Sequence, residues 1–301
     1  MTYFLVNANQ WNYCYIRLMS NKSVEIYAVK YADADYFADQ IFAPSETADA
    51  EFGKGTEFVD FNWLFYVIKT GSKVILLDTG FTSHDILKAW NMDTLNGKKF
   101  VLHDIPTLLS TIGVKTSDVT DVMLTHHDFD HAGGQHLFPN AHVHMNRTAL
   151  DTLLATNDTP AVTENLKARR GGDTLTEFDD AYEFEGVTMR MIGGHTPGSC
   201  VAEMDVGDTT YVFVADECYV LANAEEGRAI GYRIGDKAKN VAFVREMKAR
   251  IDAIDPAGAQ KGAVVKTDAD GRKTVILPFH DPAVTRQFPA VDGNDHVVKI
   301  A

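Results

Sequence analysis

Short apolar segments separated by glycine-containing turns recur along the chain, and this pattern predicts β-hairpins. Residues 59–69 are rich in aromatic and β-branched side chains, and a Thr-Gly-Ser-Lys turn separates them from the apolar run 74–77. The segments 200–206 and 209–214 flank a Gly-Asp pair in the same way and predict a second hairpin. Further strands are expected over residues 121–124, 141–145, 187–192, 263–266 and 273–277, of which the last two form a third hairpin.

Helices are predicted where apolar residues recur at intervals of three and four. The clearest is 240–254, in which Val241, Val244, Met247 and Ile251 share one face. Others are expected over 83–91, over 105–112 and from the capping residue Asn146 to about residue 155. The chain thus runs through strands, helices, strands, one long helix and strands. Two sheets with helices packed outside them would bury these faces best.

Histidines and carboxylates concentrate in one short segment directly after the predicted strand 121–124. His126, Asp128, Asp130 and His131 supply two imidazoles and two carboxylates within six residues. These donors suit Zn²⁺, Mn²⁺ or Fe²⁺. Side chains in a loop after a strand can converge on one point above a sheet. The segment therefore predicts a metal site.

Three more ligand-type residues follow later strands. His195 comes after 187–192 through a Gly-Gly pair, Asp216 follows 209–214, and His280 follows 273–277. Each stands where a strand gives way to a loop, so we expect all three at one edge of the sheets.

The composition is that of an ordinary globular protein, with 45% hydrophobic and 23% charged residues among 301. No Pro-, Gly- or Ser-rich linker divides the chain, so we expect a single domain over residues 1–301. The cysteines number three, and no basic segment precedes an apolar run at the start of the chain. We therefore expect a reduced, cytoplasmic protein without a secretory signal.

The chain is strongly acidic, with a net charge of −14. Such a surface repels phosphate backbones and anionic lipids, so we expect neither nucleic acid nor membrane as a partner. Bound divalent cations would offset part of the charge. The expected partner is a small-molecule substrate.

The segment 124–134 resembles the His-x-His-x-Asp-His signature of the metallo-β-lactamase superfamily. The motifs Leu77-Asp78-Thr79-Gly80, His195-Thr196-Pro197-Gly198 and Ala215-Asp216 are similar to further landmarks of that family. The resemblance covers most of the chain, from about residue 58 to residue 281. It implies the family's α/β fold, an αββα sandwich of two mixed β-sheets flanked by helices.

The resemblance also implies a dinuclear centre. One divalent metal ion would be held by His126, Asp128 and His195, and the other by Asp130, His131 and His280, with Asp216 bridging the two. Asp78 would lie beneath the site as the partner of a ligand histidine.

The chain departs from the signature at Asp128, where the family has a second histidine. A carboxylate makes the site harder, and the related flavodiiron proteins, which have Glu there, bind iron. We expect zinc, with manganese or iron as alternatives. His127 is an alternative ligand, but a neighbour on an extended segment points the other way.

Within the superfamily, the segment 126–140 and the Tyr219 that follows Asp216 by three residues resemble the N-acyl-homoserine lactonases. This implies hydrolysis of a lactone or related small ester by a metal-bridging hydroxide. Tyr219 would stabilise the oxyanion, and Asp130 would pass a proton to the leaving alkoxide. Phe279 stands where these lactonases have glycine, which leaves the substrate open. Homodimers are common among these lactonases, so the resemblance also implies a homodimer.

Other functions fit the same residues. A thioester or phosphodiester hydrolase is the first alternative, with Arg169, Arg170, Arg228 and Arg233 as phosphate-binding candidates. A di-iron redox protein would need a flavin domain, which we do not expect after His280. A non-catalytic metal-binding protein is the third alternative, and the complete ligand set argues against it.

The segment 31–61 is unusually aromatic. We interpret it as a lid over the metals, with core packing or a subunit interface as the equal alternative. The aromatic residues concerned are Tyr36, Phe37, Phe42, Phe52, Phe58 and Phe61.

Overall fold

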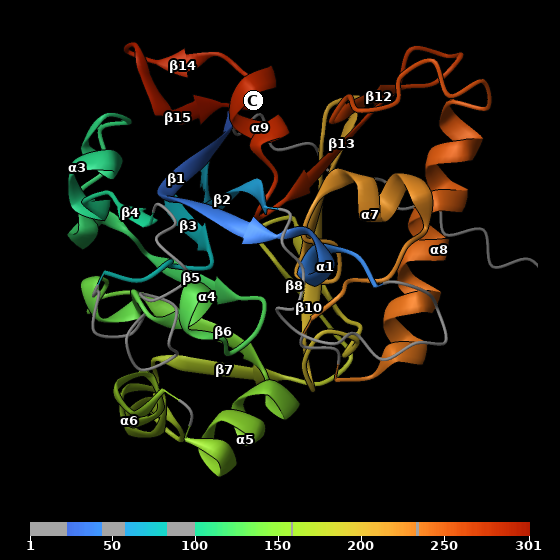
Figure 1. Ribbon diagram of the computed structural model, residues 1–301. Helices are drawn as coiled ribbons and strands as arrows, with labels where there is room; N and C mark the ends of the chain where they lie inside the picture. The colour runs from blue at the N-terminus through green and yellow to red at the C-terminus, as the bar shows by residue number, and fades with distance from the viewer. Residues whose placement is uncertain (1–22, 44–57, 83–99, 158, 233–234) are drawn as a thin grey trace, which may run out of the picture.

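Two β-sheets pack face to face, and helices cover their outer faces (Figure 1). This computed structural model describes residues 23–43, 58–82, 100–157, 159–232 and 235–301. The layering confirms the expected αββα sandwich. The predicted helix 83–91 lies outside the described residues, as does Phe52 of the aromatic segment.

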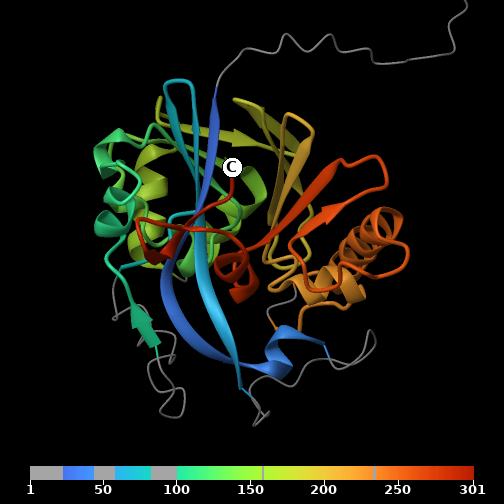
Figure 2. The same ribbon diagram turned by 90° about the horizontal axis from the view of Figure 1, so that it is seen from above.

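The first sheet has the strand order β14-β15-β1-β2-β3-β5-β6-β7, with β4 paired to β1. Its members are β1 (Val24–Phe37), β2 (Phe58–Thr70), β3 (Lys73–Leu77), β4 (Phe100–Leu102), β5 (Asp121–Leu124), β6 (His142–Asn146), β7 (Leu175–Phe178), β14 (Ala290–Val291) and β15 (Asn294–Lys299). The long β1–β2 ribbon crosses the molecule toward helix α1 (Ala38–Ile41), as Figure 2 shows.

The second sheet has the order β12-β13-β11-β10-β9-β8. Its members are β8 (Ala181–Phe184), β9 (Val187–Met191), β10 (Cys200–Val206), β11 (Thr209–Ala215), β12 (Val265–Thr267) and β13 (Lys273–Pro278). Only β11 and β13 run parallel in this sheet. The polypeptide therefore leaves both strands at the same edge.

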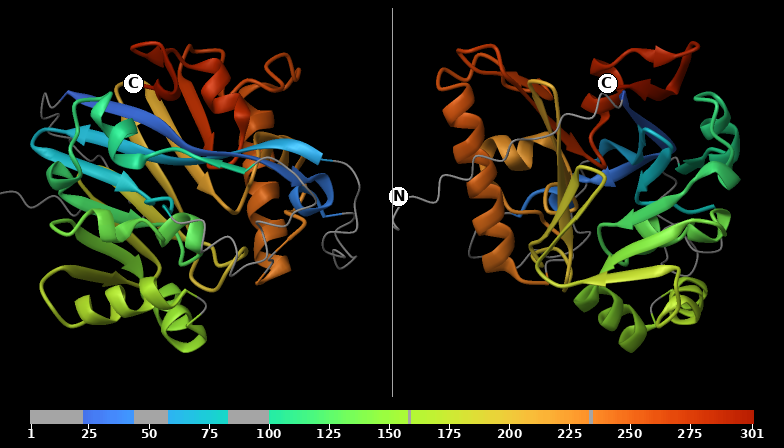
Figure 3. Two further views of the ribbon diagram at one scale, coloured as in Figure 1. Left: turned by 60° about the vertical axis from the view of Figure 1, so that its left-hand side comes forward. Right: turned by 180° about the vertical axis from the view of Figure 1, so that it is seen from behind.

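Helices on the two sides come from different parts of the chain. Those beside the first sheet are α3 (Ile105–Ser110), α4 (Phe129–Ala132), α5 (Arg147–Thr156) and α6 (Pro160–Arg169). Those beside the second sheet are α7 (Leu221–Glu226) and α8 (Lys237–Ile254), while α9 (Pro282–Gln287) precedes the C-terminal hairpin (Figure 3). None of the helices in these described ranges is long and apolar enough to cross a membrane.

Strand β2 shows why the sandwich has two cores. Leu64, Tyr66 and Ile68 belong to the core between the sheets. The intervening Phe65 and Val67 belong to the core beneath the first sheet's helices. Because side chains alternate along a strand, a strand buried on both faces must be apolar at every position.

The predicted hairpins and the predicted helices within the described ranges are present, with ends shifted by a few residues. Asn146 caps α5 by accepting a hydrogen bond from the Thr148 amide at 2.9 Å, as expected. The helix α6 and the strands β7 and β8 were not predicted. Their polar, half-exposed positions lack the apolar periodicity on which such predictions depend.

Candidate metal centre

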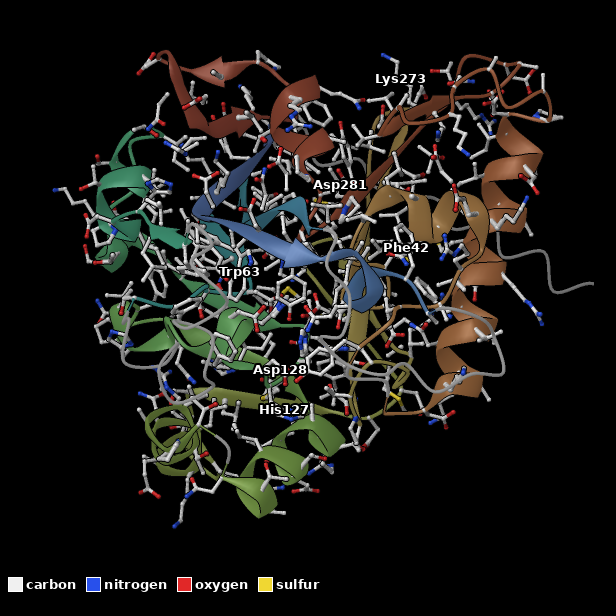
Figure 4. The ribbon with its side chains drawn as sticks, viewed as in Figure 1. Phe42, Trp63, His127, Asp128, Lys273 and Asp281 are labelled. Atoms are coloured by element: carbon white, nitrogen blue, oxygen red, sulfur yellow. The ribbon has the colours of Figure 1, made fainter. Side chains whose placement is uncertain are left out.

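The predicted ligands all lie at strand ends on one edge of the sandwich. His126 and Asp128 follow β5, and α4 begins directly after Asp128, which places Asp130 and His131 within that short helix. The remaining three residues, His195, Asp216 and His280, follow β9, β11 and β13 of the second sheet. The loop after β5 thus faces the ends of the second sheet, and Figure 4 labels Asp128 there beside His127.

The seven side chains form two groups in which all ligand atoms lie within 4.8 Å of one another. One group contains His126, Asp128 and His195, and the other contains Asp130, His131, Asp216 and His280. His127 belongs to neither group, and its Nε2 lies 3.8 Å from Asp128 Oδ1. The structure therefore brings together every residue of the predicted ligand set.

Asp216, a member of the second group, also faces the first and turns one oxygen toward the histidines of each. Its Oδ1 is 3.1 Å from Nε2 of both His131 and His280. Its Oδ2 is 3.5 Å from Nε2 of His195 and 3.8 Å from Nε2 of His126. This is the arrangement that a bridging carboxylate requires.

These residues fit a pair of divalent cations. The Nε2 atoms of His126 and His131 are buried and make no hydrogen bond with the described residues. A buried polar atom without such a partner is costly, and a metal ion in the centre would supply one. Imidazole nitrogens and carboxylate oxygens are the donors that Zn²⁺, Mn²⁺ and Fe²⁺ accept.

Asp78 orients His131 from below. Asp78 Oδ2 is 2.7 Å from His131 Nδ1 and accepts a second hydrogen bond, also 2.7 Å long, from the hydroxyl of Thr125. Its other oxygen accepts from the Thr125 amide at 2.7 Å. With Nδ1 engaged in this way, the Nε2 of His131 is left to face Asp216. Asp78 thus contacts one of the predicted ligand histidines.

His280 is fixed from the side of β2. Its Nδ1 lies 3.0 Å from the main-chain oxygen of Asn62, and its ring stacks on Phe61 with centroids 4.3 Å apart. Both contacts direct Nε2 toward the centre.

Glu217 is a buried residue that the sequence analysis missed. Its Oε1 accepts hydrogen bonds from the amides of Gly194 at 2.9 Å and His195 at 3.0 Å, and from the Ser199 hydroxyl at 2.5 Å. Its Oε2 accepts from Asn240 at 3.0 Å. Glu217 therefore holds the loop that carries His195. The available signal was a second carboxylate directly after Asp216, at the end of an apolar strand.

A Cβ atom at position 194 would collide with Glu217 Oε2 and with the backbone of Asn240. Gly194 is thus needed for the close approach of the loop to Glu217 and α8.

Burial and neighbouring charges act in opposite directions on the pKa values of the centre. Burial alone would lower the pKa of His131, but the carboxylates of Asp216 and Asp130 raise it well above its usual value. Burial alone would raise the pKa of Asp216, but His131 and His280 hold it well below its usual range. Burial and the neighbouring His131 lower the pKa of His126. The carboxylates thus favour positive charge in the centre, which protons or metal ions can provide.

Tyr219 lies against His195 on the second-sheet side. Its hydroxyl is 3.4 Å from His195 Nδ1 and donates a hydrogen bond to the main-chain oxygen of Tyr232 at 2.9 Å. Burial, followed by the charge of Asp216, raises the pKa of Tyr219 well above its usual value, so the hydroxyl stays protonated.

Part of the aromatic segment 31–61 borders the centre. Tyr36 stacks on Phe61 with centroids 4.6 Å apart, and Phe61 in turn stacks on His280. The guanidinium of Arg228 lies 4.4 Å from the ring centroid of Phe42. The side chains of Phe37 and Phe58 lie outside what the structure describes. The lid role stays a prediction.

Comparison with known proteins gives a consistent result. Residues 64–253 match the profile of the Metallo-beta-lactamase superfamily. Two probable metallo-hydrolases, from Mycobacterium bovis and Mycobacterium tuberculosis, are each 30% identical over 175 residues. These matches cover 51% of this chain and 56% of each relative, so the chain spans little more than half of their length.

Solved structures extend the similarity to most of the fold. An N-acyl homoserine lactone hydrolase, with the product N-hexanoyl-L-homoserine bound at its catalytic metal centre, has a TM-score of 0.64 at 16% identity, covering 88% of this chain and 96% of that one. A quorum-quenching N-acyl homoserine lactone lactonase has a TM-score of 0.65 at 16% identity, covering 90% of this chain and 97% of that one. At this identity the likeness shows the fold alone.

Proposed function

Because the chain belongs to the metallo-beta-lactamase superfamily, we propose that it is a metal-dependent hydrolase that opens a lactone or a related small ester. The observation that carries the proposal is the position of Asp216, whose two oxygens face two separate groups of buried ligands. The fold that this chain shares with lactone hydrolases supports the choice of a lactone as the first substrate class.

The ligand set is proposed to hold two divalent metal ions, with zinc first and iron or manganese as alternatives because Asp128 replaces a histidine. Such ions lower the pKa of a bound water to about 7 and polarise a carbonyl oxygen, which supplies a nucleophile at neutral pH. The protein's contribution is to fix the ligands, and Asp78, Glu217 and Asn62 do so for three different histidines.

Asp130 is proposed to carry the proton. Its side chain is 12% exposed, more than that of any other ligand, so it lies on the open side of the centre. Its Oδ2 is 3.3 Å from His131 Nε2 and 3.6 Å from His280 Nε2. Tyr31 donates a hydrogen bond to the Asp130 main-chain oxygen at 2.7 Å and fixes the backbone there. Asp130 would take a proton from the attacking water and return it to the departing alkoxide.

Tyr219 is proposed to stabilise the negative charge that develops on the carbonyl oxygen. Its raised pKa keeps the hydroxyl a hydrogen-bond donor. Since that hydroxyl donates to the Tyr232 main-chain oxygen, donation to a substrate requires exchange of this acceptor.

The phosphodiester alternative is the less favoured one. Arg169 donates a hydrogen bond to the Ala141 main-chain oxygen at 2.7 Å, and Arg170 pairs with Glu177 and Asp151. Both guanidiniums are thus already engaged, and Arg233 lies outside the described residues. The homodimer expected from the lactonase resemblance also stays a prediction.

The test compares zinc-loaded protein on a panel of acyl-homoserine lactones, simple lactones, a thioester and a phosphodiester. We expect lactone opening by the wild type. The Asp216→Ala variant should lose at least one metal ion per chain and nearly all turnover. If only the thioester or the phosphodiester were hydrolysed, that compound class would replace the lactone as the proposed substrate. Normal activity of Asp216→Ala would contradict a centre in which Asp216 is shared by two metal ions.

A further inference from the structure

Outside the metal centre, the described residues bring together one further group of three ligand-type side chains. It consists of Asp33, His103 and His296, whose ligand atoms lie within 4.8 Å of one another. Asp33 lies on β1, His103 directly follows β4, and His296 lies on β15. Since β4 and β15 both pair with β1, the first sheet itself assembles this group.

The contacts within the group are close. His103 Nε2 lies 2.8 Å from Asp33 Oδ2, and the rings of His103 and His296 have centroids 3.9 Å apart at an angle of 35°. The backbone is fixed as well, because the His103 amide donates a hydrogen bond to the main-chain oxygen of Tyr31 at 2.8 Å. Two imidazoles this close repel each other when both are protonated.

Two observations favour a cation here. The Nδ1 atom of His296 is buried and makes no hydrogen bond with the described residues, which is costly for a polar atom unless a metal ion supplies the partner. Lys30 binds Oδ1 of Asp33 at 2.8 Å, and Oδ2 faces the histidine side, 2.8 Å from His103 Nε2.

We propose that Asp33, His103 and His296 bind a divalent transition metal ion, with Zn²⁺ the best suited, at a site separate from the metal centre. Two imidazole nitrogens and one carboxylate oxygen are one of the donor sets found in three-ligand zinc sites, which leave a position for water. A pocket of about 290 Å³ adjoins the group at Asp33, and its lining includes Lys30, Arg286 and Asp295. The ion would tie β15 and the segment after β4 to β1.

The test measures how many zinc ions the chain binds. Metal-stripped wild type is compared with His103→Asn and His296→Asn after reloading with Zn²⁺ and removal of the excess. The matched control is His142→Asn, because His142 is also a half-exposed histidine on the first sheet, bonded to Thr176 and in no group of three.

We expect wild type and His142→Asn to bind one more zinc ion per chain than either site variant. Because this is a difference between variants, it does not depend on how many ions the metal centre holds or on the substrate. The additional ion should persist in Asp216→Ala, and hydrolytic turnover should be the same in His296→Asn as in the wild type.

Thermal unfolding gives a second readout. Without zinc, His296→Asn should melt close to the wild type, and added zinc should raise the melting temperature of the wild type further than that of the variant. Equal zinc content in wild type, His103→Asn and His296→Asn would overturn the proposal. An equal zinc-induced rise in melting temperature in the wild type and both site variants would also overturn it.

Discussion

The buried carboxylate of Asp78 lies 2.7 Å from His131 Nδ1, on the opposite side of the ring from Asp216. The left-handed backbone of Asp78, with φ of 65°, follows directly after β3 and carries this carboxylate under the loop after β5. Burial raises the pKa of Asp78, although His131 and the Thr125 amide oppose the rise. The carboxylate is therefore held in place by the same residues that it orients.

Replacing Asp78 with Asn should weaken metal binding. The change removes the charge that sets the orientation of His131, and loss of such a partner costs about 10–100-fold in metal affinity. Titration of the metal-stripped variant with Zn²⁺ measures this directly. The matched control is Asp121→Asn, because Asp121 is also buried and also bonds a histidine, His144, at 3.1 Å. Equal metal affinity in the two variants would contradict the role of Asp78.

The Glu217→Gln substitution should destabilise the protein and reduce activity together. Both oxygens of Glu217 accept hydrogen bonds, from four donors in all. The NH₂ group of a glutamine would therefore face at least one N–H or O–H donor and could not accept its hydrogen bond. We expect a loss of about 1–3 kcal/mol in the free energy of unfolding. The His195 loop should shift, which lowers turnover.

Asp255→Asn is the control for that experiment. Asp255 is buried and accepts from the amides of Ala259 and Gln260 beyond α8. We expect a stability loss with normal kcat. If Glu217→Gln likewise kept a normal kcat, Glu217 would have no positioning role.

The Tyr219→Phe substitution should lower kcat about 100-fold while metal content stays the same, since a single oxyanion donor is worth about that factor. The substitution also removes the hydrogen bond to the Tyr232 main-chain oxygen, which should lower the free energy of unfolding by about 1 kcal/mol. Tyr66→Phe removes a comparable buried hydrogen bond, from the Tyr66 hydroxyl to the Pro278 main-chain oxygen at 2.6 Å. An equal kcat in both variants would assign Tyr219 a structural role only.

The Tyr36→Ala substitution tests the lid. Tyr36 stacks on Phe61 beside His280, so its removal should weaken binding of an acyl substrate and raise KM. An aromatic contact is worth about 0.5–1.5 kcal/mol, which corresponds to a rise of about two- to tenfold. Metal content should not change. Tyr182→Ala, which removes an aromatic stacked on His144, is the control, and an unchanged KM in Tyr36→Ala would remove the lid interpretation.

The lowered pKa of Asp121 predicts how the stability of the protein changes in acid. Burial alone would raise its pKa, but hydrogen bonds from His144, Thr120 and Lys73 lower it from 3.8 to about 2. A lowered pKa contributes stability above the unfolded value of 3.8, and this contribution disappears as the pH falls toward 2. At pH 6 the free energy of unfolding of the wild type should therefore be about 1–2 kcal/mol larger than that of Asp121→Asn. Urea unfolding should show this gap closing below pH 3.8, and a gap independent of pH would contradict the assignment.

The sequence by itself predicted two sheets flanked by helices and the residues that the structure brings together at one edge of them. Runs such as 74–77 and 122–124 are apolar at every position, as strands buried on both faces must be, and each ends in a loop with ligand-type side chains. Spacing within one loop is a local property, so His126 to His131 could be identified without a structure. The later residues His195, Asp216 and His280 follow predicted strands, and their role as ligands came from the family resemblance.

Only the tertiary structure decided how those residues are held. The partners of His131, His195 and His280 are Asp78, Glu217 and Asn62, and the separations in sequence range from 22 to 218 residues. The group of Asp33, His103 and His296 likewise depends on pairing between β1, β4 and β15. Hydrogen bonds and stacking act over a few ångströms in space, and a linear pattern does not record which distant strands become neighbours.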